Sequence, residues 1–111
     1  MSLRHTQNLF LQDVIKLLQK AQELGFEPTF GEVYRPIEMQ QIYIKTGRSQ
    51  TMNSMHLKRL AIDLNLFRDG RLANKAEVQP LGDFWTSLNP KNVWGGNWKS
   101  LVDTPHFERK E

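Results

Sequence analysis

The stretch "SMHLKRLAIDLNLF", residues 54–67, decides the fold because a polar loop runs there into a regularly alternating segment. In its second half Ile62, Leu64 and Leu66 fall on one side of an extended chain, and the polar residues between them fall on the other. This alternation predicts a β-strand with one buried face. A carboxylate between apolar neighbours must be paired, solvated or bound to a metal, so Asp63 is a candidate functional residue.

The segments around this strand show helical and extended patterns in turn, without the regular order of βαβ units, which is typical of the α+β class. We expect one small domain over residues 1–111, with a short antiparallel sheet flanked by helices and a metal site on the sheet. The pattern predicts a helix over 6–24, a strand over 28–35, a helix from Pro36 to Gly47, a loop over 48–54, a turn over 68–71, a short proline-interrupted helical segment over 77–88, and a strand over 106–108.

The composition is that of an ordinary soluble globular protein, with 39% hydrophobic and 24% charged residues among 111. No apolar run approaches the roughly 18 residues that a membrane-spanning helix needs, so we expect no membrane insertion. The N-terminus lacks the uninterrupted apolar segment of a signal peptide, which predicts that synthesis ends in the cytoplasm. The net charge is +3, but the basic residues are scattered, which argues against a nucleic-acid-binding module.

His56 stands seven residues before Asp63. On a straight strand an odd offset puts two side chains on opposite faces, so the chain between them must bend if both are to reach one site. Taken alone, this His-x6-Asp pattern indicates a metal site only weakly, and a loop histidine beside a strand is the simpler interpretation.

A second cluster, "VDTPHFE" at residues 102–108, strengthens the metal hypothesis. Asp103 stands three residues before His106, and the proline between them favours a tight bend. The chain has no cysteine, so a metal must be held by histidine and carboxylate side chains. His56, Asp63 and His106 supply two nitrogens and one oxygen, the ligand set of a catalytic zinc site that keeps its fourth position for water. Asp103 would remain free to take a proton from that water, which suits amide hydrolysis.

These motifs resemble those of the zinc peptidases that cut D-amino-acid bonds in peptidoglycan stem peptides. That family comprises D-alanyl-D-alanine carboxypeptidases and dipeptidases, and the L-alanyl-D-glutamate endopeptidases of phage lysins. Its pattern of Ser-x-His, six residues and Asp, followed by acid-x-x-His, is met at Ser54, His56, Asp63, Asp103 and His106. The resemblance extends over residues from about 30 to 108.

The resemblance implies that His56, Asp63 and His106 hold one catalytic zinc ion and that Asp103 is the general base. It also implies a substrate-binding arginine after an early strand, which points to Arg35. A guanidinium suits that role because it stays charged and makes two parallel hydrogen bonds.

Further candidates flank the motifs. Ser54 is a candidate substrate contact that would equally serve as the cap of a turn. Trp94 and Trp98 are candidate substrate contacts, with one of them expected at the rim of the pocket, whereas Trp85 is expected in the core. Gln40 could support the site or face water, and the sequence does not decide between these positions.

The implied reaction is zinc-dependent hydrolysis of a stem-peptide amide, with an L-alanyl-D-glutamate endopeptidase of phage or prophage lysin type as the first candidate. A D-alanyl-D-alanine carboxypeptidase or dipeptidase would use the same ligands and is the alternative. A catalytically degenerate wall-binding module is a further alternative, although Asp103 would have no purpose there. For the endopeptidase we expect a monomer that reaches the cell wall after holin-assisted release and has stem peptides as its partners.

The chain departs from the family pattern at Arg59. Family members often have glycine three residues after the first ligand, and here that position holds arginine. If the backbone needs a positive φ at this position, an arginine is strained there.

Overall fold

The alternating stretch forms the longest strand, β2 (Ala61–Arg68), in the computed structural model, which describes residues 2–111. It pairs with β1 (Glu27–Phe30) along one edge and with β5 (His106–Arg109) along the other. The short strand β3 (Arg71–Leu72) returns against the end of β2, and β4 (Asn92–Trp94) pairs with β5. Every pairing is antiparallel, and the order of the four main strands is β1-β2-β5-β4.

The register gives the sheet two chemically different faces. Ile62 lies opposite Phe107, and Asp63 lies opposite His106. Because directly paired residues of an antiparallel sheet point to the same side, one face carries the apolar pair and the other carries the polar pair. We call these the core face and the site face.

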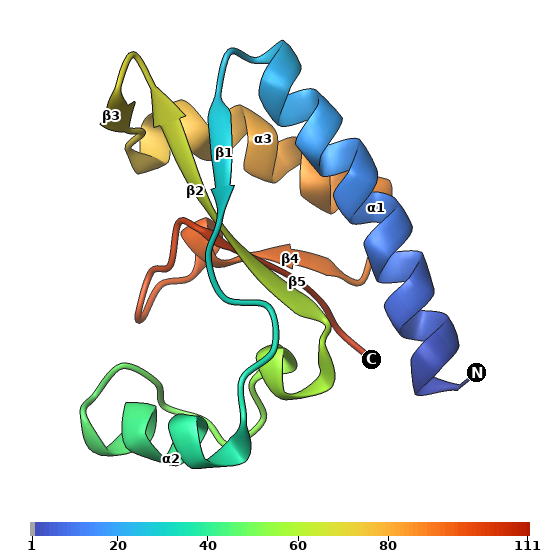
Figure 1. The fold of residues 1–111 in the computed structure, drawn as a ribbon, viewed down its shortest axis with the longest axis vertical. Helices are drawn as coiled ribbons and strands as arrows, with labels where there is room; N and C mark the ends of the chain where they lie inside the picture. The colour runs from blue at the N-terminus through green and yellow to red at the C-terminus, as the bar shows by residue number, and fades with distance from the viewer. Residues whose placement is uncertain (1) are drawn as a thin grey trace.

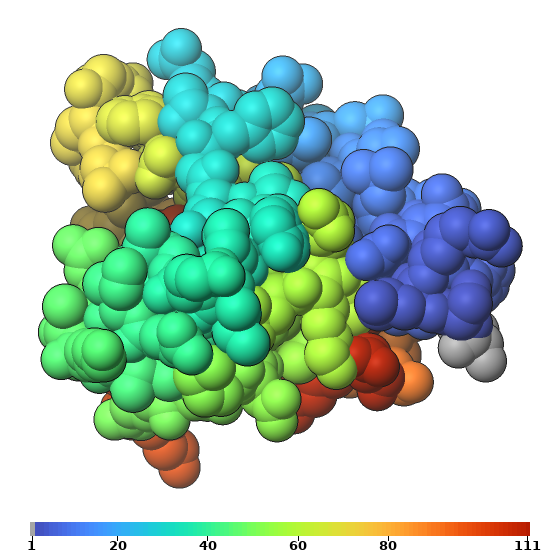
Figure 2. Space-filling model, turned by 60° about the horizontal axis from the view of Figure 1, so that its bottom comes forward, coloured from blue at the N-terminus to red at the C-terminus, as the bar shows by residue number. Residues whose placement is uncertain are grey.

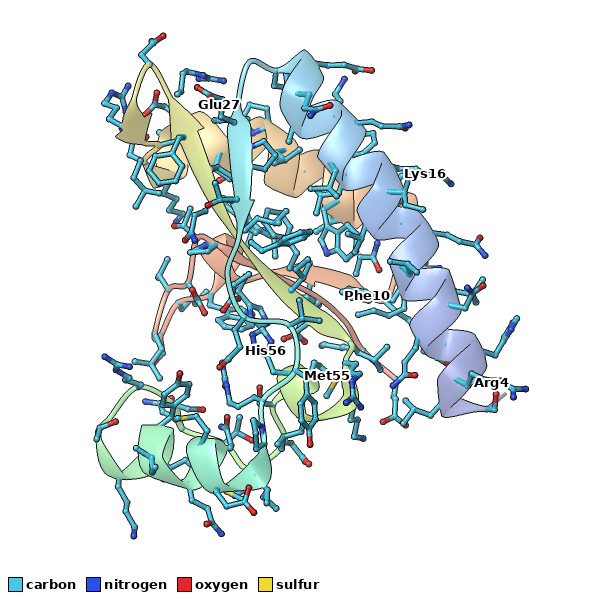
Figure 3. All side chains as sticks on the ribbon, in the orientation of Figure 1. Arg4, Phe10, Lys16, Glu27, Met55 and His56 are labelled. Atoms are coloured by element: carbon cyan, nitrogen blue, oxygen red, sulfur yellow. The ribbon has the colours of Figure 1, made fainter. Side chains whose placement is uncertain are left out.

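Two helices cover the core face (Figure 1). These are α1 (Leu3–Glu23) and α3 (Lys75–Leu88), which pack against each other and against β1 and β4 respectively. Figure 3 shows Phe10 pointing from α1 toward the sheet, while Arg4 and Lys16 point outward. The core combines apolar side chains from both helices and from the sheet: Phe10, Val14, Leu17, Ala21, Ile62, Leu64, Leu66, Val78, Leu81, Trp85, Trp94 and Phe107.

The site face is bordered by loops and short helices. Helix α2 (Ile37–Lys45) and the loop after it lead to the short 3₁₀ helix η1 (Met55–Lys58), and a second 3₁₀ helix, η2 (Gly95–Asn97), follows β4. In Figure 2 α2 and its loop form one lobe, and η1 lies between this lobe and the start of α1. Ile37, Met39 and Ile42 of α2 remain exposed, so this helix contributes little to the core.

The predicted α+β class is confirmed, and several predicted boundaries are corrected. Helix α1 starts at Leu3 instead of residue 6, because Ser2 caps it by accepting a hydrogen bond from the backbone N–H of His5. Helix α3 is longer than expected and runs through Pro80 without interruption. Its start is fixed by a reciprocal capping box between Asn74 and Glu77.

The strands differ more from the prediction. Strand β1 ends at Phe30, and the chain then accompanies β2 only as far as Glu32, whose carbonyl accepts a hydrogen bond from the N–H of Asp63 at 2.8 Å. Strands β3 and β4 were not predicted, because pairing with β2 and with β5 stabilises these short segments more than local propensity does. No helix within residues 2–111 is long and apolar enough to cross a membrane.

Candidate metal centre and cleft

Three side chains converge on the site face. Asp63 of β2 and His106 of β5 are brought together by the strand register, and His56 approaches from η1. One ligand atom from each lies within 4.8 Å of those from the other two, so this group could hold a metal ion. The convergence joins residues that are up to 50 positions apart in the chain.

The bend that His56 requires is present. Residues Met55–Lys58 form η1, and Arg59 ends it in the left-handed conformation, with φ 55° and ψ 36°. The N–H of Leu60 then donates to the carbonyl of Met55 at 3.0 Å, and β2 begins at the following residue. The chain therefore turns between the two motif residues, and this turn removes the opposite-face constraint of a straight strand.

The hydrogen bonds of His56 fix which nitrogen faces Asp63. Its Nδ1 lies 2.9 Å from the carbonyl oxygen of Val33, and a carbonyl can only accept, so Nδ1 carries a proton. In the neutral ring Nε2 then keeps its lone pair. This Nε2 is buried, has no hydrogen-bond partner among residues 2–111 and lies 3.2 Å from Asp63 Oδ1, so two lone-pair atoms face each other. A bound cation would satisfy both atoms, and this is how the residues fit a metal.

His106 is held by the carboxylate of Glu108, which the sequence motifs did not predict. Its Nε2 lies 2.7 Å from Glu108 Oε1, and its Nδ1 lies 3.2 Å from Asp63 Oδ1. When Nε2–H donates to Glu108, the neutral ring presents Nδ1 to the metal position. Burial disfavours the charged ring, but Asp63 and Glu108 outweigh that effect and raise the pKa of His106 to about 9. A proton and a metal ion therefore compete for this position.

Asp63 is kept ionised by its neighbours. Burial alone would raise its pKa, but the pKa is held well below its usual range, and the largest lowering effect is the hydrogen bond with the adjacent ring of His106. The approach of the preceding loop to Asp63 requires glycine at Gly31, since a Cβ there would lie 2.9 Å from the Cβ of Asp63.

Asp103 lies beside the three ligand candidates and is not one of them. Its Oδ2 is 3.9 Å from His106 Nδ1, and its side chain is 43% exposed. Burial, with the charge of Asp63 adding to it, raises the pKa of Asp103 above its ordinary value, which makes this carboxylate a better proton acceptor. The backbone N–H of Asp103 donates to the carbonyl of Gly95 at 3.0 Å, and this approach requires glycine, since a Cβ there would collide with the carbonyl oxygen of Asp103.

Arg35 is buried above the same cleft and has several partners. It forms an ion pair with Glu32, and its Nη1 donates to Gln40 Oε1 at 2.6 Å and to Ser54 Oγ at 3.2 Å. The guanidinium also lies over the ring of Tyr43, 4.5 Å from its centre. The carboxylate, the amide and the ring together hold this cation in one orientation.

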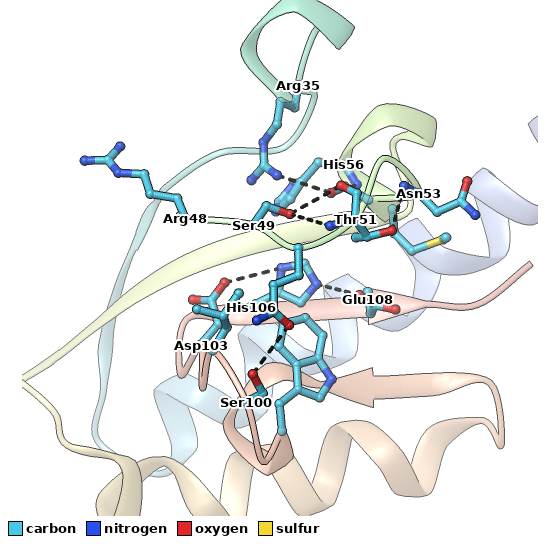
Figure 4. A pocket seen from close by; sticks show the side chains of 15 residues that line it. Arg35, Arg48, Ser49, Thr51, Asn53, His56, Ser100, Asp103, His106 and Glu108 are labelled. Atoms are coloured by element: carbon cyan, nitrogen blue, oxygen red, sulfur yellow. Dashed lines mark hydrogen bonds and ion pairs between the residues drawn. The ribbon is translucent and has the colours of Figure 1, made fainter. Parts of the chain in front are cut away.

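These side chains border a cleft of about 370 Å³ (Figure 4). His56, Asp103, His106 and Glu108 line it, together with Arg35 and Arg48, neutral polar residues of the 49–54 loop, and Trp98. The ring of Trp98 lies 4.9 Å from that of His106, centre to centre. Ser54 caps η1 by accepting from the N–H of His56 at 3.3 Å, as one of its two candidate roles predicted, and it also lines the cleft.

The position of Trp94 differs from the prediction. It is fully buried in the core, stacks near Phe107 and donates from Nε1 to the carbonyl of Thr104 at 2.8 Å. It does not line the cleft, so the predicted substrate contact at Trp94 is wrong. Trp85 is fully buried, as expected.

From the sequence we predicted no role for Glu108 and did not decide whether Gln40 supports the site. Glu108 had a readable signal, because residues two apart on a strand share a face and His106-x-Glu108 is such a pair. Gln40 had no such signal. Its 0% exposure and its bonds to Arg35, Ser49 and Thr51 arise only when α2 and the following loop come together.

Comparisons with known proteins agree with this geometry. Residues 47–109 match the peptidase M15 family model described as D-alanyl-D-alanine carboxypeptidase. The chain is 30% identical over 102 residues to the L-alanyl-D-glutamate peptidase of Listeria phage A118, a match that covers 84% of this chain and 34% of that protein. The chain thus spans about a third of the length of this curated relative.

A solved structure shares the fold. The crystal structure of the Serratia marcescens L-Ala D-Glu endopeptidase ChiX superposes with a TM-score of 0.69 at 24% identity, covering 89% of this chain and 79% of that one. The family match covers more than half of the present sequence and includes all three ligand candidates and Asp103. The chain belongs to the peptidase M15 family, as its motifs predict.

Proposed function

We propose that this protein is a zinc-dependent peptidase that hydrolyses the L-alanyl-D-glutamate bond of peptidoglycan stem peptides. The observation that carries the proposal is the unpartnered, buried Nε2 of His56, which faces Asp63 beside a cleft that also contains Asp103. The phage A118 and Serratia proteins, both named for this bond, support the choice of substrate.

The three converging side chains would hold the metal, His56 through Nε2, His106 through Nδ1 and Asp63 through its carboxylate. A zinc ion bound there would polarise the substrate carbonyl and lower the pKa of a water molecule to roughly 7. Asp103, which borders the cleft and has a raised pKa, would accept a proton from the attacking water and pass it to the departing amine.

Arg35 would bind the substrate at the carbonyl that is attacked. Negative charge develops on that oxygen in the transition state, and a fixed cation stabilises it without having to reorganise. Glu32, Gln40 and Tyr43 hold the guanidinium in place before substrate arrives. Ser54 and Trp98, which also line the cleft, are proposed to contact the peptide.

A D-alanyl-D-alanine carboxypeptidase is the second candidate. It is favoured by the description of the matching family model, and it would use the same ligands and the same base. The two activities differ in the bond that they cut, so the products separate them.

The test combines metal analysis of the purified protein with mass spectrometry of products from purified peptidoglycan, using Asp103→Asn as the matched control. We expect one zinc per chain in both proteins, and new L-alanine and D-glutamate ends only with the wild type. Loss of a positioned general base lowers turnover by about 10²- to 10⁴-fold. Released D-alanine would transfer the assignment to the carboxypeptidase, and zinc without any cleavage would favour a wall-binding module.

The relative from a phage supports a lysin-type role, with action on the cell wall after holin-assisted release. We also propose that residues 1–111 act as a single monomeric domain. Light scattering coupled to size-exclusion chromatography tests this, because a monomer has a mass of 13.0 kDa.

A further inference from the structure

The two arginines that line the cleft differ in whether their guanidinium groups have partners. Arg35 and Arg48 are its two arginines, and Asp103 and Glu108 are its carboxylates. The guanidinium of Arg35 is engaged by Glu32 and Gln40. The guanidinium of Arg48 makes no ion pair and no hydrogen bond with any side chain or carbonyl of residues 2–111. Within the described chain, Arg48 is therefore the free cation of the cleft.

The backbone of Arg48 is held by α2, and its exposed side chain lies beside the ring of Tyr43. Its backbone N–H donates to the carbonyl of Tyr43 at 2.8 Å, and its guanidinium lies 5.5 Å from the centre of the Tyr43 ring. The next residue, Ser49, accepts a hydrogen bond at 2.8 Å from Nε2 of the buried Gln40. Tyr43 also lies beside the guanidinium of Arg35, so one ring of α2 contacts both guanidinium groups, and Gln40 joins Arg35 to the residue that follows Arg48.

The two arginines point to different parts of the cleft. In Figure 4 the guanidinium of Arg35 points toward His56, whereas that of Arg48 points away from His106 and Glu108. Arg48 is thus placed to bind a part of the substrate that lies at some distance from the reacting carbonyl. Its charge and lack of a partner suit an anionic group, and the lining residues that follow it in the chain, Ser49, Gln50 and Thr51, carry no charge that would compete.

The proposed substrate offers such a group. In an L-alanyl-D-glutamate bond the residue on the leaving-amine side has two carboxyl groups, and a peptide continues through only one of them. We propose that Arg48 binds the free carboxylate of this D-glutamyl residue and thereby selects it over uncharged residues. This inference rests on the proposed function and adds a specificity-determining residue to it.

The test compares two synthetic stem peptides, one with D-glutamate after L-alanine and one in which its free carboxyl group is amidated. The ratio of kcat/KM for the two peptides is measured for the wild type, Arg48→Gln and Lys45→Gln. Lys45 is exposed at the end of α2 and does not line the cleft, so its variant controls for the loss of one positive charge. Zinc content is measured in all three proteins.

We expect the wild type and Lys45→Gln to prefer the carboxylate peptide by about tenfold to a hundredfold, the usual range for one hydrogen bond to a charged group. Arg48→Gln should lose this preference, through slower cleavage of the carboxylate peptide alone, with zinc retained. An unchanged ratio in Arg48→Gln, or an equal loss on both peptides, would overturn the role of Arg48 and leave the endopeptidase proposal standing. Zinc-loaded wild type that cuts neither peptide would overturn both.

Discussion

The two faces of the sheet differ in what holds them together. On the core face Ile62, Leu64 and Phe107 are buried against α1 and α3, and their contribution comes from the removal of apolar surface from water. On the site face Asp63 and His106 are also largely buried, but they are held by hydrogen bonds and charge. Adjacent residues on the same two strands therefore serve stability and chemistry separately, because the side chains of a strand alternate between its faces.

Even the polar groups of the core face serve structure. Arg109 of β5 forms a buried ion pair with Asp13 of α1 and donates to Asn92 at 3.0 Å. Within residues 2–111 every buried side-chain nitrogen and oxygen of this cluster has a hydrogen-bond partner. His56 Nε2 on the site face has none among the same residues, and this difference distinguishes a structural polar cluster from a site that can receive a ligand.

The largest predicted effect concerns the core face. Phe107→Ala should lower the free energy of unfolding by about 3–5 kcal/mol, because it removes a fully buried ring that packs between Trp85 and Trp94. Urea denaturation measures this loss. The matched control is Phe30→Ala, since that phenylalanine is 73% exposed and its removal should change stability by less than about 0.5 kcal/mol. Equal losses in both variants would contradict the assignment of this stability to the burial of apolar surface.

The next effect concerns the neighbour of Phe107 on the site face. Glu108→Ala should weaken zinc binding by about 10- to 100-fold, because His106 loses the acceptor that fixes its ring and tautomer. Glu108→Gln should weaken it less, since an amide oxygen can still accept from Nε2–H. Competition with a chelating indicator measures the affinity, and Glu38→Ala, which removes an exposed carboxylate of α2, is the control. An affinity equal to that of the wild type in Glu108→Ala would show that His106 needs no such partner.

The sequence predicted the elements whose signal is local. The alternation around Asp63 predicted β2 and its buried face, helical spacing predicted α1 and α2, and the motifs singled out the residues that converge. Gly47, predicted to end α2, has φ +77° two residues after its last helical residue. These features depend on neighbours in the chain, and periodicity makes them visible.

Features that depend on distant contacts could not be predicted from one sequence. Strand β4 exists because β5 pairs with it, and Trp94 is buried because that strand lies over the core. Gln40 is enclosed only once the 49–54 loop folds over it. The sequence around Trp94 is compatible with a place in the core or at the pocket rim, and that around Gln40 with a buried or an exposed side chain. Only the tertiary structure distinguishes these positions.

The smallest predicted effect concerns the backbone of Arg59, which has φ 55° and lies in the bend between η1 and β2. Any residue with a Cβ is disfavoured there by about 1–2 kcal/mol, whereas glycine is not. Arg59 also lies over Tyr34, 4.1 Å from the ring centre, and that contact is lost in any truncation. Both variants lack this contact, so comparing Arg59→Gly with Arg59→Ala isolates the contribution of the backbone.

We expect the glycine variant to be more stable than the alanine variant by about 1 kcal/mol in urea denaturation, although glycine is normally the less stable of the two within regular elements. The reverse order would mean that the backbone at Arg59 leaves the left-handed region in solution, and the bend that brings His56 to Asp63 would then need another origin.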